Sequence, residues 1–416
     1  MWTVYFVTIP TVHYDVIIIG GGASGCYAAA QLSDLRPDLS IAIIEKTSSF
    51  LSKVKISGGG RCNITHHQFE PKLLSQNYPR GSKELLGSFF RYAVDETLSY
   101  FESLGVEWKA ESDGRIFPVS DNSQTVIDAL MQKLHNNKVK LIYPQGVKAI
   151  SKQENAFVVG TTSCEYKANA VIVATGSAPN MNKVITALGH KLVAAVPSLF
   201  TFHIEEPKLL KLQGISAEVE AKAEGIETFG PLLITHWGLS GPAILKLSAW
   251  GARQFFEKHY KFYLNLNWVR KKQQEVLAEL EEFKHQNANE SILKPQWGLS
   301  KRLWGYLIDR ADLSQKNWAE CSRKELQKLQ EVLTHDTYSV VKKSTYKQEF
   351  VTAGGVRLKD VDLKTFESKI RQGLYFTGEV LNVDGITGGY NFQNAWTSAY
   401  LAASAIANSE LAGLNQ

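Results

Sequence analysis

Residues Asp15–Gly25 read DVIIIGGGASG, and this stretch decides the fold of the N-terminal part of the chain. Its β-branched run, Val16–Ile19, is typical of a strand buried on both faces of a parallel sheet. Gly20, Gly22 and Gly25 follow with the spacing G-x-G-x-x-G and open a helix. The free N–H groups and positive dipole end of such a helix attract the phosphates of a dinucleotide.

A carboxylate stands where such a site needs one. Glu45, twenty residues past Gly25, closes the predicted second strand in the run SIAIIEK. In this place it can accept both hydroxyls of an adenosine ribose. No arginine stands beside it, which favours a free 2′-hydroxyl over a 2′-phosphate. A glycine turn that only packs a helix on a sheet leaves Glu45 unexplained, so the sequence predicts a bound dinucleotide.

Further glycine clusters point to FAD as that dinucleotide. The loop Ser57–Asn63 (SGGGRCN) can offer N–H groups to an isoalloxazine ring, although a flexible hinge is the alternative. The predicted strand AVIVA (170–174) leads into Thr175-Gly176 and returns beneath the dinucleotide. Gly378-Glu379, at another strand end, can place a carboxylate against the ribityl hydroxyls.

The last cluster opens the C-terminal helix, predicted over 393–408. Gly388-Gly389 would present the positive end of this helix to the flavin N1–C2=O edge, where reduced flavin carries negative charge. Such a dipole stabilises the charge by roughly 0.3–2 kcal/mol. A bare structural turn is the alternative.

Composition sets wider limits. The 416 residues suffice for two or three domains, and 44% hydrophobic and 21% charged residues are ordinary for a globular protein. A net charge of +5 suits a phosphate-bearing cofactor and makes a nucleic-acid partner unexpected. The four cysteines form no C-x-x-C, which excludes a dithiol pair or zinc site adjacent in sequence, and we expect no metal.

No secretion or membrane signal is evident. Met1–Thr11 contains no lysine or arginine, unlike the start of a signal peptide, and no run of about 20 apolar residues occurs. We therefore expect a cytoplasmic protein without membrane association.

The periodicity of apolar residues changes along the chain. Strand and helix patterns alternate over 1–195 and return over 351–416, which predicts a discontinuous FAD-binding domain of α/β class. Period-two alternation, as in Tyr260–Asn267 (YKFYLNLN), predicts a β-barrel-like insertion over 196–268 and 336–350. Helical periodicity predicts a helical subdomain over 269–335.

Three local expectations accompany this division. Ser82–Leu104 is helical in pattern, and a second helix is expected over Asn122–Asn136. The run Ser322-Arg323-Lys324-Glu325 is a capping box that should open a helix.

Several motifs together carry a family resemblance. GGGASG, SGGGRCNIT, THWGLSGPAIL, VTAGGV and TGEVLNVDGITGGYNFQNAW resemble a bacterial BaiN/RdsA-type, aminoacetone-oxidase-like family of NAD(P)/FAD-dependent oxidoreductase flavoproteins, from about Asp15 to Ile406. The resemblance implies a Rossmann-type FAD domain of glutathione-reductase type, interrupted by an antiparallel β-barrel and a small helical piece. It also implies non-covalent FAD. The sequence departs from the family pattern at Asn382 and His66, where the family has aspartate and asparagine.

The residue patterns and the resemblance together give the expected FAD contacts. They are Gly20, Gly22, Ala23, Ser24, Gly25, Glu45, Lys46, Ser57, Gly58, Gly59, Gly60, Arg61, Cys62, Asn63, Val147, Ala174, Thr175, Gly176, Gly378, Glu379, Asp384, Gly388, Gly389, Tyr390 and Asn391.

The predicted activity is that of an FAD-dependent oxidoreductase moving hydride through flavin N5, to or from a small organic substrate, with C=C reduction as one form. No second complete G-x-G-x-x-G exists, so NADH or NADPH would dock only transiently. Candidate catalytic residues are Arg61, for polarising a carbonyl or carboxylate, and Asp384 or His236, for proton transfer. Arg61 can equally bind phosphate.

Two alternatives stay open. A flavin-dependent tRNA-modifying protein would need a broad basic surface, which the modest net charge supports weakly. A non-catalytic flavin-binding sensor or interaction protein would use the insertion as its partner surface. Substrate identity and oligomeric state are left open by the sequence.

Overall fold

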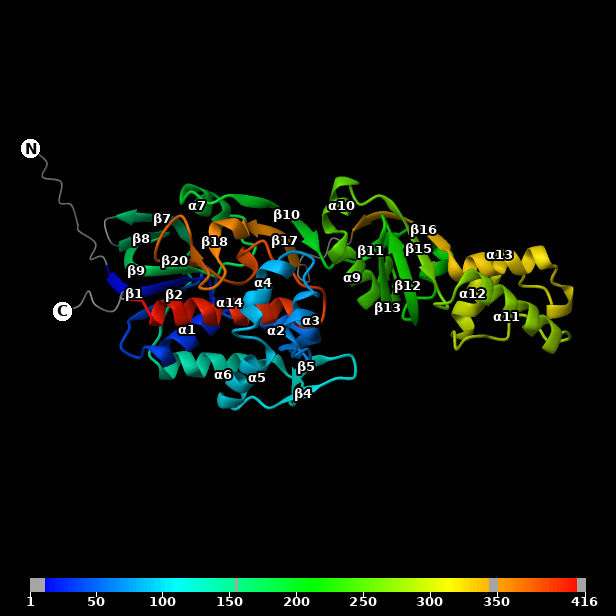
Figure 1. Cartoon of the computed structure of the whole chain (residues 1–416), viewed down its shortest axis with the longest axis horizontal. Helices are drawn as coiled ribbons and strands as arrows, with labels where there is room; N and C mark the ends of the chain where they lie inside the picture. The colour runs from blue at the N-terminus through cyan, green and yellow to red at the C-terminus, as the bar shows by residue number, and fades with distance from the viewer. Residues whose placement is uncertain (1–11, 154–155, 344–350, 410–416) are drawn as a thin grey trace, which may run out of the picture. The chain divides into compact units, whose positions relative to one another are not determined.

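The computed structural model describes residues 12–153, 156–343 and 351–409 (Figure 1). The chain divides into two compact units, which we call the FAD unit (Met1–Ala195 with Thr352–Gln416) and the inserted unit (Val196–Val351). The expectation about Met1–Thr11, and the part of the predicted barrel segment that covers 344–350, lie outside the described residues.

A parallel sheet forms the centre of the FAD unit. Its parallel strands are, in spatial order, β6 (Lys140–Ile142), β2 (Ile41–Ile44), β1 (Val12–Ile19), β9 (Glu165–Val173) and β20 (Leu374–Phe376). The side chains of Val16–Ile19 and Val171–Val173 are buried, as continuous apolar runs predict. Antiparallel strands complete the sheet: β7 (Val147–Gln153) and β8 (Ala156–Thr161) beside β9, and β18 (Val361–Asp362) and β19 (Glu367–Ser368) beside β20.

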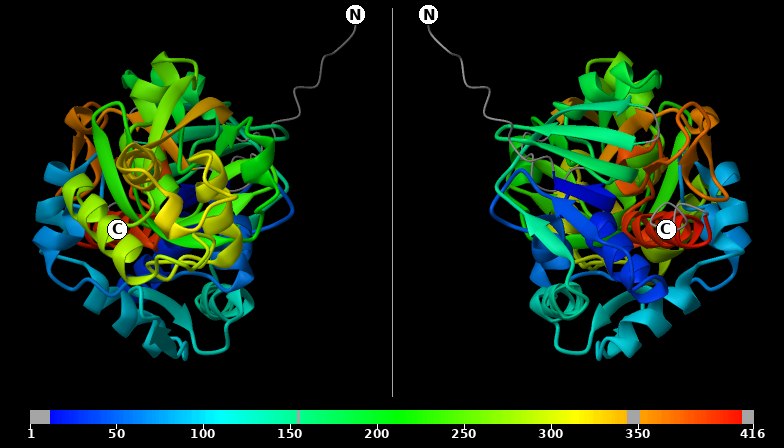
Figure 2. Two further views of the ribbon diagram at one scale, coloured as in Figure 1. Left: turned by 90° about the vertical axis from the view of Figure 1, so that its right-hand side faces the viewer. Right: turned by 90° about the vertical axis from the view of Figure 1, so that its left-hand side faces the viewer.

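Two long helices cover one side of this sheet. α1 (Ala23–Leu35) and α14 (Tyr390–Ala407), both rich in buried alanine, lie side by side, while the β7–β8 hairpin lies on the other side (Figures 1 and 2). The other helices of the unit are α2 (Ser52–Gly60), α3 (Pro71–Ser75), α4 (Ser82–Phe89), α5 (Val94–Ser103), α6 (Ser123–Asn136) and α7 (Met181–Ala187), with the 3₁₀ turns η3 (Leu358–Asp360) and η4 (Gly378–Val380).

Two small sheets complete the FAD unit. One is antiparallel, with β5 (Arg115–Pro118) between β3 (Thr65–His66) and β4 (Trp108–Ala110). The other pairs β10 (Leu192–Ser198) with β17 (Val351–Val356), the two strands in which the chain leaves the FAD unit and returns to it.

Three helix predictions need correction. Ser82–Leu104 is two helices, because the Glu96 carboxylate accepts a hydrogen bond from Ala93 N–H (2.7 Å) and starts a new helix there. α14 begins at Tyr390, directly after Gly388-Gly389, and not at Gln393. The sequence pattern also predicts a break near Lys55–Asn63, but the segment is helical from Ser52, and its backbone dihedrals leave the helical region only at Ser57–Gly59.

A closed antiparallel barrel forms the first part of the inserted unit. Its order is β11 (Phe202–Ile204), β14 (Gly238–Ser240), β13 (Ile226–Thr235), β12 (Ser216–Ala223), β15 (Phe262–Asn267) and β16 (Asp336–Lys343). The helices of the unit are α8 (Pro207–Leu210), α9 (Pro242–Trp250), α10 (Ala252–Glu257), α11 (Gln273–Gln286), α12 (Lys301–Arg310) and α13 (Arg323–Thr334), with the 3₁₀ turn η1 (Trp318–Glu320).

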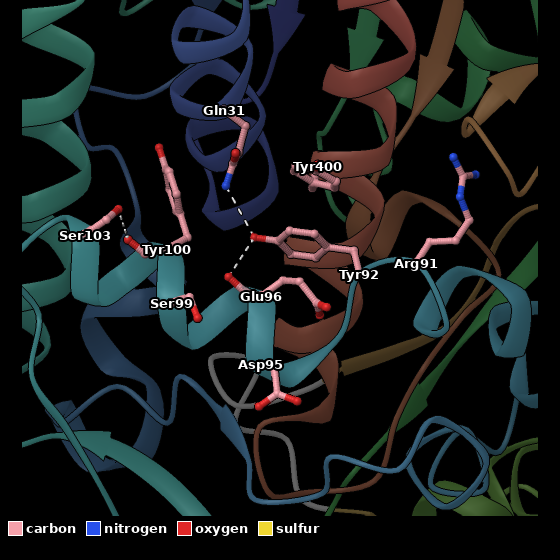
Figure 3. Close-up of a pocket in the computed structure, with 9 residues that line it drawn as sticks. All are labelled: Gln31, Arg91, Tyr92, Asp95, Glu96, Ser99, Tyr100, Ser103 and Tyr400. Carbon is pink, nitrogen blue, oxygen red and sulfur yellow. Dashed lines mark hydrogen bonds between the residues drawn. The ribbon is translucent and has the colours of Figure 1, made fainter.

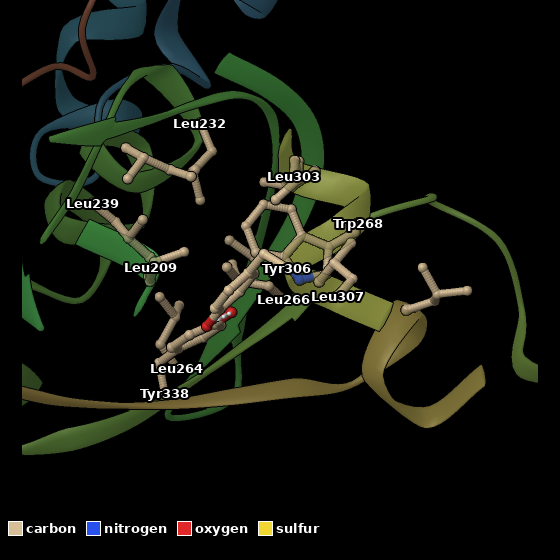
Figure 4. Packing of buried hydrophobic residues seen from close by; sticks show 14 of the residues in the cluster. Leu209, Leu232, Leu239, Leu264, Leu266, Trp268, Leu303, Tyr306, Leu307 and Tyr338 are labelled. Carbon is tan, nitrogen blue, oxygen red and sulfur yellow. Dashed lines mark hydrogen bonds between the residues drawn. The ribbon is translucent and has the colours of Figure 1, made fainter. Parts of the chain in front are cut away.

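One hydrophobic core serves the barrel and the helices α11–α13. Barrel residues such as Leu264 and Leu266 belong to the same buried cluster as Leu303 and Leu307 of α12 (Figure 4). α13 begins with the predicted capping box, since Ser322 Oγ accepts from Glu325 N–H (3.3 Å) and Ser322 N–H donates to Glu325 Oε2 (2.9 Å). Among the described residues, no helix has the length and apolar character needed to cross a bilayer.

Candidate functional site

Two of the three motif glycines are required by the protein's own packing. A Cβ at Gly20, whose φ is +109°, would lie 2.5 Å from Ala174 O. A Cβ at Gly25 would lie 2.0 Å from Gly20 O. The turn and the approach of α1 to the sheet therefore exclude any side chain at these positions, as the motif predicts.

Gly22 is different, because a Cβ there would meet no atom of the described residues within 4 Å. It is the N-cap residue of α1, and no side chain caps that end of the helix. The first-turn N–H groups thus open onto free space, which is the arrangement that binds phosphate. The packing of the chain does not demand a glycine at 22, whereas close approach of a diphosphate does.

The Glu45 carboxylate is held in place at the end of β2. Its Oε2 accepts from Gly21 N–H (2.8 Å), and its Oε1 accepts from the N–H (2.8 Å) and hydroxyl (2.9 Å) of Thr47. Each carboxylate oxygen accepts about two hydrogen bonds, so capacity remains for a ribose hydroxyl. Gln145 N–H donates to Glu45 O (2.8 Å) and brings the start of β7 beside it. Val147 is buried, while Lys46 is exposed.

The triple glycine adopts left-handed backbone at each position. The φ values of Gly58, Gly59 and Gly60 are +57°, +70° and +86°. A Cβ at Gly58 would lie 2.8 Å from the Phe117 ring, whereas one at Gly59 would meet nothing within 4 Å. An ordered backbone with an open glycine fits a loop that lies against a flat ligand.

Hydrogen bonds tie this loop to the start of α14. In the amide orientation that satisfies both of its ends, Asn63 Oδ1 accepts from Gly389 N–H (2.9 Å). Thr65 Oγ1 donates to Gln393 Oε1 (2.6 Å), and Trp396 Nε1 donates to Ile64 O (2.9 Å). His66 Nδ1 lies 3.0 Å from Gly388 O, and its ring stacks on Tyr390. The two glycine clusters predicted at the flavin are therefore neighbours in space.

The segment after β20 also reaches this edge of the sheet. A Cβ at Gly378 would lie 2.9 Å from Ser24 Cβ, and Ser24 Oγ donates to Ala395 O (3.3 Å). Glu379 pairs with Lys53 through Oε2 and accepts from Thr352 N–H through Oε1 (3.1 Å). A Cβ at Gly176 would lie 3.4 Å from Glu379 Oε2.

Buried polar atoms without partners mark the same edge. The hydroxyls of Thr175 and Thr377, which follow the paired strands β9 and β20, have no hydrogen-bond partner among the described residues. Buried polar groups are nearly always satisfied, so these atoms indicate a ligand or water. With the open glycines and the oriented Glu45, they fit an extended dinucleotide such as FAD at the carboxyl ends of the strands.

Other predicted contacts serve the protein itself. Asn391 forms two hydrogen bonds with the backbone of Gly385 (2.9 Å each), and Tyr390 O accepts from the Tyr78 hydroxyl (2.6 Å). Cys62 is buried, and this burial raises the pKa of its thiol to about 12, so the thiol stays protonated. Ala23 is the first residue of α1, and Ala174 directly follows β9.

The candidate catalytic residues Asp384 and Arg61 belong to the FAD unit, and His236 belongs to the inserted unit. Asp384 is fully buried and forms a two-pronged ion pair with Arg80. Arg61 pairs with Glu111 (2.6 Å) and lies over the Phe117 ring. His236 is exposed on the turn between β13 and β14 of the inserted unit and packs on Trp237.

Three residues at this edge of the sheet were not predicted from the sequence: Lys53, Thr352 and Thr377. Lys53 stands in no motif. Thr352 lies in the motif VTAGGV, but only the fold brings the two residues to Glu379. Thr377 directly precedes Gly378-Glu379, so a search for hydroxyls at strand ends could have found it.

A surface pocket of about 510 Å³ lies elsewhere in the FAD unit, on α1, α5 and α14 (Figure 3). Tyr92, Tyr100 and Tyr400 line it, and the Tyr92 hydroxyl contacts Gln31 Nε2 and Glu96 O (3.3 Å each). It contains none of the predicted cofactor residues. Among the described residues, no group of three or more His, Cys, Asp and Glu side chains is arranged to hold a metal ion.

Comparison with known proteins identifies the family of this chain. The family described as HI0933-like protein Rossmann domain matches residues 14–405. The chain belongs to this family. The predicted family resemblance and fold class are thereby confirmed, with a Rossmann-type FAD domain and a closed six-strand antiparallel barrel.

Curated relatives match this chain over nearly its whole length. A 3-dehydro-bile acid delta(4,6)-reductase of Clostridium scindens is 28% identical over 94% of this chain and 98% of the relative. A ribosomal RNA dihydrouridine synthase of Haemophilus influenzae is 29% identical over 95% of this chain and 98% of the relative. The Escherichia coli protein of the same name is 29% identical, over 94% and 97%.

Solved structures share the fold. A 3-ketosteroid-Δ4-(5α)-dehydrogenase from Rhodococcus jostii, in complex with 4-androstene-3,17-dione, aligns with a TM-score of 0.51 at 13% identity, over 97% of this chain and 99% of that one. The chain thus belongs to the class of FAD-dependent oxidoreductases, as predicted.

Proposed function

We propose that this protein is a reductase that saturates a C=C bond in an unsaturated ring substrate, with NADH or NADPH as a transient hydride donor. The observation that carries the proposal is the open space in front of Gly22 and Gly59, framed by the oriented Glu45 and the unpartnered Thr175 and Thr377. The names of the curated relatives, a reductase and dihydrouridine synthases, support a reductive direction.

Each part of the site has a binding task. The first turn of α1 would hold the diphosphate, and Glu45 would hold the adenosine ribose. The left-handed loop Gly58–Gly60 and the start of α14 would frame the flavin ring, and the dipole of α14 favours negative charge at the ring edge that it faces. When bound, FAD supplies the hydride-carrying N5 atom.

Asp384 and His236 are the two residues predicted for proton transfer. We assign Asp384 a positioning role, because its buried carboxylate is already paired with Arg80. His236 is exposed and free of an ion pair in the described structure, so it is the candidate proton donor.

Anaerobic stopped-flow spectroscopy tests this function. The protein is mixed with NADH or NADPH, and then with a conjugated steroid enone. We expect bleaching of the flavin band by one donor and its return on addition of the enone, with a reduced C=C bond in the product by mass spectrometry. A flavin that no donor bleaches, or that only oxygen restores, contradicts the proposal.

A second candidate substrate is a uridine in RNA. It is favoured by two relatives named as ribosomal RNA dihydrouridine synthases, which align over 98% and 97% of their own lengths. Reoxidation of the reduced protein by a uridine-containing rRNA fragment, with a gain of two mass units in the RNA, would establish it. RNA that neither binds at low salt nor reoxidises the flavin would exclude it.

A further inference from the structure

The chain crosses between its two compact units at Ala195–Val196 and again at Val351–Thr352. Both crossings lie in the paired strands β10 and β17. β17 packs tightly on β10 on the FAD side of the crossing, since a Cβ at Gly354 would lie 2.7 Å from Ala194 O. The chain therefore leaves and re-enters the FAD unit through a two-stranded ribbon, β10–β17.

The other edge of β17 is joined to the segment that follows β20. A Cβ at Gly355 would lie 2.3 Å from Val380 O, and Asn382 N–H donates to Val356 O (3.0 Å). Val356 and Leu381 also form a parallel bridge. The strand that carries the inserted unit thus runs beside residues 379–382, which sit at the carboxyl edge of the central sheet.

Glu379 is the side chain at this junction. Its Oε1 accepts from the N–H of Thr352, the first residue of β17 that belongs to the FAD unit (3.1 Å). Its Oε2 pairs with Lys53 of α2 and faces the loop after β9 at Gly176. The carboxylate is largely buried, with 19% of the side chain exposed. One group therefore touches both the cofactor edge and the start of the ribbon.

We propose that Glu379 is a positioning residue that couples cofactor occupancy to the stiffness of the β10–β17 ribbon. The inference rests on the proposed function, because it takes the cofactor to be FAD at this edge. Each carboxylate oxygen can accept about one further hydrogen bond beyond those seen. A ribityl hydroxyl bound there would order the carboxylate, and an ordered carboxylate holds Thr352 N–H more firmly at no further entropic cost.

Hydrogen–deuterium exchange of peptides over residues 351–357 tests this coupling in FAD-loaded and FAD-depleted full-length protein. In the wild type we expect the Thr352 amide to exchange about tenfold more slowly with FAD bound, the range expected for a hydrogen bond to a charged acceptor. Glu379→Ala should abolish that FAD-dependent difference.

Two further variants separate the proposed coupling through Glu379 from a general effect on stability. Lys53→Met removes the ion pair but keeps the Thr352 bond, so the FAD-dependent protection should persist. Glu367→Ala is the matched control, since Glu367 Oε1 also accepts a backbone N–H (Gly373, 2.7 Å), at the opposite end of β20. Its effect should stay near Gly373. If Glu379→Ala does not fold, Glu379→Gln keeps an acceptor oxygen and should show reduced protection.

Flavin absorbance of every sample distinguishes the two ways of failing. A wild type that takes up no FAD contradicts the proposed function. A wild type that binds FAD with identical exchange over 351–357 in the loaded and depleted states overturns the role of Glu379 and leaves the proposed function intact.

Discussion

At the residue scale, the glycines of a single motif answer to different constraints. Gly20 and Gly25 are fixed by contacts of 2.5 Å and 2.0 Å that a Cβ would make with backbone oxygens of the same unit. Gly22 faces free space, so its constraint comes from outside the chain. Stability and cofactor binding should therefore separate when these positions are mutated.

Gly22→Val should fold normally and lose FAD. The new side chain enters open space in front of α1, where it would displace the diphosphate, and we expect FAD affinity to fall at least tenfold, about 1.4 kcal/mol. Gly25→Ala should instead lower the melting temperature, because its Cβ collides with Gly20 O. Thermal melts of the FAD-free proteins and FAD titrations measure the two effects, and a Gly22→Val protein with unchanged affinity would contradict the assignment.

A buried ion pair in the inserted unit makes a second residue-scale case. Asp336, 3% exposed, accepts from Trp268 Nε1 (2.9 Å) and the Tyr338 hydroxyl and pairs with Arg310 (2.7 Å). Burial raises the pKa of Asp336 above its usual value, and the Arg310 guanidinium opposes that rise. Removing Arg310 leaves an uncompensated buried charge.

Arg310→Leu should therefore cost about 3–5 kcal/mol of unfolding free energy at neutral pH. The loss should shrink in acid. Without the cation the folded-state pKa of Asp336 rises further above its unfolded value, so the folded state binds the proton more tightly and stability falls as pH rises through that window. Urea melts from pH 4 to pH 8 check this, with Arg302→Leu as the exposed control. A loss of unfolding free energy that does not depend on pH would contradict this prediction.

At the element scale, the first turn of α14 is held by the loop Arg61–His66 more than by its own capping. The Asn63 amide joins Gly389 N–H to Thr65 O and Ile116 O. Asn63→Ala should leave buried backbone groups unsatisfied, at about 1–3 kcal/mol, and should weaken FAD binding in parallel. Chemical melts and FAD titration measure both, against Asn137→Ala, whose amide bonds Ser33 and Asp34 near the surface. Weakened FAD binding without any loss of stability would contradict this role of the Asn63 amide.

The local sequence pattern predicted many of the helices and strands. It predicted fewer of the residues at which these elements begin and end. The β-branched run and the glycine spacing predicted the strand β1 and the helix that follows it, which is α1 (Ala23–Leu35). The break at Phe90–Ala93 depends on a Glu96 side chain turned back to a backbone N–H, which periodicity does not reveal. The start of α14 depends on hydrogen bonds from a loop more than 300 residues away in sequence, so Gly388-Gly389 alone could not mark it.

At the scale of the whole molecule, each unit has its own core. The inserted unit's cluster runs from Phe200 to Val340 and joins barrel and helices. The division of 196–351 into barrel and helical subdomain remains a prediction. The sequence predicted Glu379 as a cofactor contact but not its pairing with Lys53 and Thr352, because no local pattern links these residues.

A protein spanning residues 196–351 alone should therefore fold. Its first barrel strand, β11, pairs with its last, β16, so the ends meet at one edge. We expect a cooperative melt, dispersed amide resonances and no flavin binding. A chain that is unfolded when isolated would show that the inserted unit depends on the FAD unit for its structure.

The central claim is that the FAD unit holds FAD along the carboxyl edge of its parallel strands. The most direct measurement is the flavin content of natively purified protein, by absorbance and mass spectrometry of the released nucleotide, beside Gly22→Val. The account predicts a yellow wild type with equimolar, non-covalent FAD and a colourless, folded variant. A wild type that is colourless and takes up no FAD on reconstitution would contradict it.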